Sequence, residues 1–106
     1  MPKLILQNLN QKEVLVAPGQ KVLAAIGEAG IDWMHACGGK GRCTTCRIII
    51  LEGIQGFGEL STAEEKFRQQ GRLKANERLT CQCILQQDAV GRVPEQTKFP
   101  HQQYSA

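Results

Sequence analysis

The sequence predicts an α+β domain in which a helix packs across a small mixed sheet. Three features indicate this fold class. A chain of 106 residues has room for one domain, and 42% hydrophobic with 22% charged residues is typical of a folded globular protein. Short β-prone runs also precede and follow two segments with helical character. We expect one domain over residues 1–94, followed by a polar tail over residues 95–106.

The first elements are predicted to be a hairpin and a helix. Lys3–Asn8 and Glu13–Ala17 are β-prone runs, and the turn-like residues 8–11 separate them. Apolar side chains then recur at helical spacing from Gln20 to Ala29, and Gly30 supplies a stop signal. The glycine-rich residues that follow are expected to form a loop.

The second half predicts a buried strand, a capped helix and two short strands. Arg47–Glu52 contains four consecutive apolar residues, which suits a central strand buried on both faces. After a glycine-rich connection, Ser61 and Glu64 form a capping-box pattern at the start of a polar helix that ends before Gly71. The last two predicted strands are Cys81–Gln86 and Ala89–Val93.

Charge and targeting signals argue against several classes of function. The net charge of +3 is modest and the basic residues lie without interleaved aromatics, so we expect no nucleic-acid binding. The N-terminus turns polar after three consecutive apolar residues, which predicts a cytoplasmic protein without membrane insertion. Five cysteines fit a disulfide framework poorly in that compartment, so metal or redox chemistry is favoured. No nucleophile or acid–base pair is evident, and we expect no enzyme activity.

The five cysteines follow the spacing Cys37-x5-Cys43-x2-Cys46, then Cys81-x-Cys83 after thirty-four residues. A thioredoxin-like dithiol stands at a helix N-terminus, whereas a strand pattern follows this CxxC. Structural zinc usually takes two short-spaced pairs, and a Rieske centre needs two histidines in ligand positions. Two irons bridged by sulfides have a wider footprint, which suits three ligands on one loop and one from afar. A [2Fe-2S] cluster held by Cys37, Cys43, Cys46 and Cys81 is therefore favoured, with a zinc-stapled interaction module or a redox-sensing cluster protein as alternatives.

The loop between these cysteines is rich in glycine and in positive charge. Gly38, Gly39 and Gly41 allow backbone N–H groups to approach the sulfurs closely. Lys40 and Arg42 favour the reduced cluster, because reduction adds negative charge. We therefore predict a reduction potential above the roughly −400 mV of plant-type centres.

Two stretches resemble the [2Fe-2S] ferredoxins of the adrenodoxin and putidaredoxin type. These are CGGKGRCTTC, from Cys37 to Cys46, and RLTCQ, from Arg78 to Gln82. The resemblance implies a β-grasp fold with a cluster-binding loop, and one-electron transfer from a ferredoxin reductase or other donor to an electron-accepting protein. It also implies that Cys37 and Cys43 bind the outer iron, and Cys46 and Cys81 the inner one. We expect the carrier to act as a monomer.

The partner-docking helix of these ferredoxins is usually acidic. In this sequence, the segment from Glu59 to Arg78 contains four Glu against five Lys and Arg. The sequence therefore predicts a docking surface that is balanced to basic.

Three further residues have two interpretations each. Cys83 is expected to be a small buried hydrophobe, with the role of a rescue ligand as the alternative. His35 is expected to anchor the loop or lie at the surface rather than tune the cluster. Trp33 is expected to pack under the loop rather than relay electrons.

Overall fold

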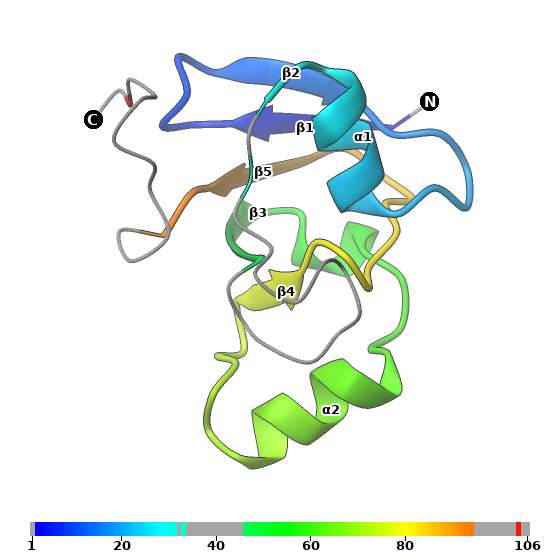
Figure 1. Cartoon of the computed structure of the whole chain (residues 1–106), viewed down its shortest axis with the longest axis vertical. Coiled ribbons are helices and arrows are strands. Elements are labelled where there is room, and N and C mark those ends of the chain that lie inside the picture. The colour runs from blue at the N-terminus through cyan, green and yellow to red at the C-terminus, as the bar shows by residue number, and fades with distance from the viewer. Residues whose placement is uncertain (1, 32, 34–45, 95–103, 105–106) are drawn as a thin grey trace.

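The computed structural model describes residues 2–31, 33, 46–94 and 104, and these form a five-stranded mixed sheet with two α-helices (Figure 1). The elements are β1 (Lys3–Leu6), β2 (Lys12–Leu15), α1 (Val22–Glu28), β3 (Arg47–Glu52), the 3-10 turn η1 (Ile54–Gly56), α2 (Thr62–Gln69), β4 (Glu77–Leu79) and β5 (Ala89–Arg92). This is the predicted α+β class and the β-grasp arrangement. No helix in the described ranges is long and apolar enough to cross a membrane.

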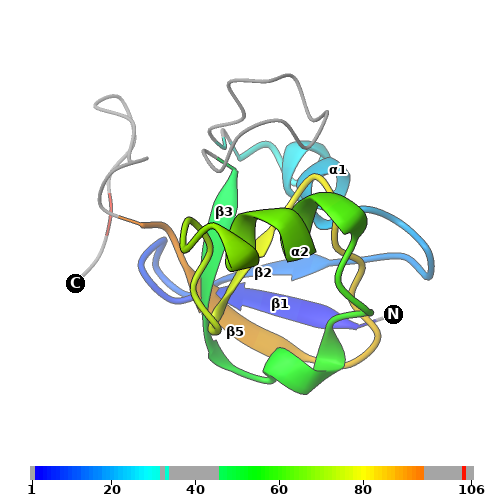
Figure 2. The ribbon, with the colours of Figure 1, turned by 90° about the horizontal axis from the view of Figure 1, so that it is seen from below.

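The sheet has the strand order β2-β1-β5-β3-β4, so β5, the last strand within the described residues, lies at its centre. β1 and β5 are parallel, whereas the other neighbouring pairs are antiparallel. Helix α1 packs across the part of the sheet near β1 and β2, and α2 lies beyond β4 at the other end of the molecule (Figures 1 and 2). The predicted hairpin, the helix within residues 20–29 and the capped helix are therefore confirmed.

The apolar run in β3 is only partly buried. Ile48 and Ile50 are buried, but Ile49 is half-buried and Leu51 is 46% exposed. The prediction of a strand buried on both faces is therefore wrong. Alternate side chains of a strand point to opposite faces, and one face of β3 is less completely covered than the other.

The predicted strand Cys81–Gln86 is also wrong. The strand of this region is β4, and the chain turns immediately after it: the backbone N–H groups of Gln82 and Cys83 both donate to the carbonyl of Leu79, at 2.9 and 3.0 Å. Only isolated bridges follow, at Ile84 and Leu85. Because Cys81 lies in a turn, the alternation of side chains along a strand does not place Cys83 on the same face as Cys81.

Gly53, the residue after β3, lies close to the backbone of Asp88 and Ala89. Gly53 has a φ of +83°, and a Cβ built there would lie 2.7 Å from the Asp88 carbonyl oxygen. Gly71 has a similar φ of +73° but open space around it. Both Gly→Ala substitutions incur the left-handed backbone cost, whereas only Gly53→Ala must also move backbone. We expect Gly53→Ala to be the more destabilising by about 1–3 kcal/mol, measured by thermal unfolding of both variants. Equal losses of stability would contradict this.

Candidate metal centre

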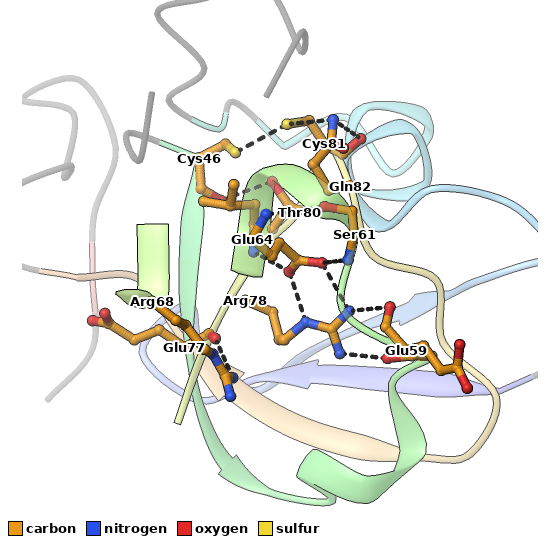
Figure 3. A network of polar contacts seen from close by, with 12 residues as sticks. Cys46, Glu59, Ser61, Glu64, Arg68, Glu77, Arg78, Thr80, Cys81 and Gln82 are labelled. Atoms are coloured by element: carbon orange, nitrogen blue, oxygen red, sulfur yellow. Dashed lines mark hydrogen bonds and ion pairs between the residues drawn. The ribbon is translucent and has the colours of Figure 1, made fainter. Parts of the chain in front are cut away.

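Two of the predicted ligands meet where β3 begins and β4 ends. These strands are antiparallel, and Arg47 pairs with Leu79. Continued by one residue, this register places Cys46 opposite Thr80, whose backbone N–H donates to the Cys46 carbonyl. Cys81 is the next residue, in the turn after β4. The sulfurs of Cys46 and Cys81 are 3.4 Å apart, and the two residues are 0% and 6% exposed (Figure 3). The pairing of β3 with β4, together with the turn that follows β4, brings together two thiols that are 35 positions apart in the chain.

The separation of the sulfurs fits two ligands of one metal ion. Two thiolates on a tetrahedral ion, with metal–sulfur bonds of about 2.3 Å, lie about 3.8 Å apart. A disulfide would need about 2.05 Å. Cys46 and Cys81 therefore have the donor type and the spacing for half of a four-thiolate site. The neighbouring Cys81 sulfur, together with burial, raises the pKa of the Cys46 thiol above its ordinary value.

The remaining predicted ligands, Cys37 and Cys43, lie outside the described residues, as do His35, Lys40 and Arg42. Within the described part of the chain, no group of three or more His, Cys, Asp or Glu side chains is placed to hold a metal ion. The complete set of four ligands therefore stays a prediction.

The backbone carbonyl of Cys46 is fixed from two sides. It accepts hydrogen bonds from Trp33 Nε1 at 2.9 Å, from Thr80 Oγ1 at 2.8 Å and from the Thr80 backbone N–H at 3.3 Å. Trp33 is 4% exposed and Thr80 is fully buried. The loop under which Trp33 is expected to pack lies outside the described residues, so that packing stays a prediction. Sequence reasoning did not single out Thr80 in this role. Thr80 follows β4 directly and precedes Cys81, and the β3–β4 register places it opposite Cys46. Its place next to a predicted ligand is the sequence signal that could have indicated this role.

A buried ion pair lies below the two cysteines in the view of Figure 3. Arg78 Nε donates to Glu64 Oε2 at 2.7 Å, and Arg78 Nη2 donates to Glu64 Oε1 at 3.0 Å. Glu64 is fully buried and Arg78 is 3% exposed. The rest of the Arg78 guanidinium donates to the carbonyls of Gly58 and Glu59. This pair joins the start of α2 to β4, three residues before Cys81.

Glu64 has a second set of partners. It forms the predicted capping box with Ser61, and Leu79 N–H donates to its Oε2 at 3.0 Å. Burial alone would raise the pKa of Glu64, but the hydrogen bonds from Arg78, Ser61 and Leu79 outweigh burial and hold that pKa below its ordinary value. The capping role was predicted from the sequence, whereas the ion pair with Arg78 was missed.

Cys83 is a buried residue, as the first interpretation expects. It is 1% exposed, and burial raises the pKa of its thiol to about 12. A thiol of this kind is protonated at neutral pH and behaves as a small hydrophobe.

The chain is similar to proteins of known function. A family model described as "2Fe-2S iron-sulfur cluster binding domain" matches residues 6–86. The 2Fe-2S ferredoxin of Haemophilus influenzae is 36% identical over 81 residues, which are 74% of this chain and 72% of that protein. Other relatives are much longer. One of them, a component of the Na(+)-translocating NADH-quinone reductase of Idiomarina loihiensis, is 31% identical over 94 residues, which are 89% of this chain but only 22% of that protein.

Solved structures agree with the sequence matches. The ISC-like [2Fe-2S] ferredoxin FdxB of Pseudomonas putida superposes with a TM-score of 0.74 at 28% identity, covering 90% of this chain and 94% of that one. Oxidized putidaredoxin superposes with a TM-score of 0.70 at 27% identity, covering 88% of this chain and 96% of that one. The fold described above is thus shared with solved structures of [2Fe-2S] ferredoxins.

Proposed function

The chain belongs to the family of 2Fe-2S iron-sulfur cluster binding domains, and we propose that four of its cysteines hold one [2Fe-2S] cluster. These ligands are Cys37, Cys43, Cys46 and Cys81. The protein is a [2Fe-2S] ferredoxin electron carrier, an electron-transfer protein rather than an enzyme. The contact between the Cys46 and Cys81 sulfurs supports the inner half of this ligand set. The family match over residues 6–86 includes Cys37 and Cys43, which supports the outer half.

The residues around the paired cysteines hold the ligands in place. When bound, the cluster takes up and releases one electron at a time. Trp33 and Thr80 fix the Cys46 carbonyl, which orients the backbone that carries the first sulfur. The Glu64–Arg78 pair fixes β4, and the turn that follows β4 carries the second. Such outer contacts orient ligands and limit how far the site must rearrange when the charge changes.

We infer that the partners are a ferredoxin reductase or another donor and an electron-accepting protein. The residues near α2 that face solvent include Glu59 and Glu65 as well as Lys66, Arg72 and Lys74. Arg78, Glu64 and Glu77 are buried and do not contribute to this surface. A surface of mixed charge supports a partner whose docking patch is not strongly basic.

We also propose that the carrier works as a monomer in the cytoplasm. Thiols stay reduced in that compartment and are free to bind iron. We further propose one domain over residues 1–94, followed by a tail over residues 95–106. The family match over residues 6–86 and the end of β5 at Arg92 support this division.

Anaerobic purification tests the proposal. We expect a brown protein with two irons and two acid-labile sulfides per chain, and a rhombic electron paramagnetic resonance signal after reduction. Redox titration should give a potential above roughly −400 mV, because Lys40 and Arg42 favour the reduced state. A colourless protein with stoichiometric zinc would reject the cluster. A potential below that value would reject the charge argument alone.

A further inference from the structure

The side chain of Gln82 reaches back to the sulfur of the residue before it. Gln82 Nε2 lies 3.7 Å from Cys81 Sγ and 3.4 Å from the Cys81 carbonyl oxygen (Figure 3). Both neighbours are acceptors, so the amide N–H₂ end faces them and not the amide oxygen. Among the described residues, Gln82 thus offers a side-chain N–H donor to a proposed ligand sulfur.

The backbone of Gln82 is held independently of this contact. Its N–H donates to the Leu79 carbonyl at 2.9 Å, which closes the turn after β4. Its carbonyl accepts from Lys21 Nζ at 3.2 Å, from the residue that precedes α1. Gln82 is half-buried, so its amide is partly screened from water. The donor is therefore anchored next to the sulfur by contacts that remain when the side chain is changed.

We propose that Gln82 is a positioning residue that raises the reduction potential of the cluster by donating an N–H to Cys81 Sγ. Hydrogen bonds to the ligand sulfurs are among the factors that set the potential of iron–sulfur clusters. Reduction adds one negative charge to the cluster and its thiolates. A fixed donor stabilises the more negative state more strongly, so it favours reduction. This inference rests on the proposed role of Cys81 as a ligand.

The positive charge of Lys21 would also influence the reduction potential, and this influence can be separated from that of the Gln82 hydrogen bond. Its ammonium is exposed to solvent, so its influence on the cluster is that of a charge screened by salt. The contact of Gln82 is a short-range hydrogen bond that salt screens little. The two contributions therefore differ in how they depend on ionic strength.

Redox titration of variants of the cluster-loaded protein tests the proposal. Gln82→Met keeps an unbranched side chain but removes the donor, and Gln82→Glu keeps the shape but replaces the donor with an acceptor. We expect Gln82→Met to lower the equilibrium constant for reduction about two- to tenfold, where tenfold is 59 mV for one electron. Gln82→Glu should lower it further. The Gln82→Met shift should persist at high salt, whereas that of Lys21→Met should shrink.

Gln86→Met is the matched control, because Gln86 is an exposed glutamine on the same segment. Its potential should equal that of the native protein. An unchanged or raised potential in Gln82→Met would overturn the inference, and if that variant loads no cluster, the same result in Gln82→Glu would do so. If the native protein itself holds no iron and sulfide, it is the proposed cluster that fails; if it is loaded, only the role of Gln82 is at stake.

Discussion

Replacing Cys81 by serine is expected to remove both irons and both sulfides of the native cluster. Cys81 is buried and its sulfur lies 3.4 Å from that of Cys46, so in the proposed ligand set its loss would leave the inner iron with one protein thiolate. A hydroxyl is a much weaker ligand for this ion than a thiolate. Iron and acid-labile sulfide per chain, with the visible absorption spectrum, measure the effect. Cys46→Ser should have the same outcome.

Cys83→Ser is the matched control for this prediction. Cys83 is 1% exposed, so serine there buries a hydroxyl and costs about 1–3 kcal/mol of stability, but the cluster should be retained. A cluster that persists in Cys81→Ser and disappears in Cys81→Ser/Cys83→Ser would make Cys83 a rescue ligand. A native spectrum in both variants would remove Cys81 from the ligand set.

Replacing Arg78 by methionine is expected to lower the stability of the protein by about 3–5 kcal/mol, because the Glu64 carboxylate then stays buried without its charged partner. In a domain of this size, that corresponds to a fall in melting temperature of at least roughly 12 °C. The measurement is thermal unfolding of the cluster-loaded protein at a fixed scan rate, followed by circular dichroism and by visible absorption.

Two comparisons isolate the buried pair. Arg78→Met/Glu64→Gln should be more stable than Arg78→Met alone, because the unpaired charge is gone. Lys3→Met breaks an exposed pair with Glu13 and should have little effect on melting. A loss in Arg78→Met no larger than that in Lys3→Met would show that the buried pair does not stabilise the fold.

The pair should also make stability depend on pH. The pKa of Glu64 is lowered in the folded state, so its contribution is complete above its ordinary pKa of 4.5 and is lost as pH falls through the lowered value. Glu64→Gln should lack that part of the acid dependence. The same slope of melting temperature against pH in both proteins would contradict this assignment.

The capping box shows how far local sequence patterns reach. Ser61 and Glu64 are three residues apart, and their reciprocal hydrogen bonds were predictable because capping is a local property of the backbone. The partner of Glu64, Arg78, is fourteen residues away, and the pairing depends on where β4 lies against α2. From the sequence, Glu64 and Arg78 were counted among the charges of a docking surface, because no local pattern marks Arg78 as buried.

The region after β4 shows the opposite error. Cys81–Gln86 has strand-like composition, but its backbone turns to bring Cys81 to Cys46. The strand lies instead at Glu77–Leu79. Its charged residues do not suggest a buried strand in the sequence, but Glu77 and Arg78 are buried in the fold together with their charged partners. The type of cofactor was nevertheless predictable, since cysteine spacing reflects the cluster chemistry and not the local fold.

The register of β3 against β4 also bears on how a cluster is acquired. The pairing of β3 with β4 and the turn after β4 place Cys46 and Cys81 together, so backbone hydrogen bonds contribute to offsetting the entropy cost of bringing these distant thiols into contact. As proposed ligands, the two thiols would be held next to each other before a cluster is bound. The sheet would then supply part of the chelate advantage of the site, because it holds two of the four proposed ligands in neighbouring positions.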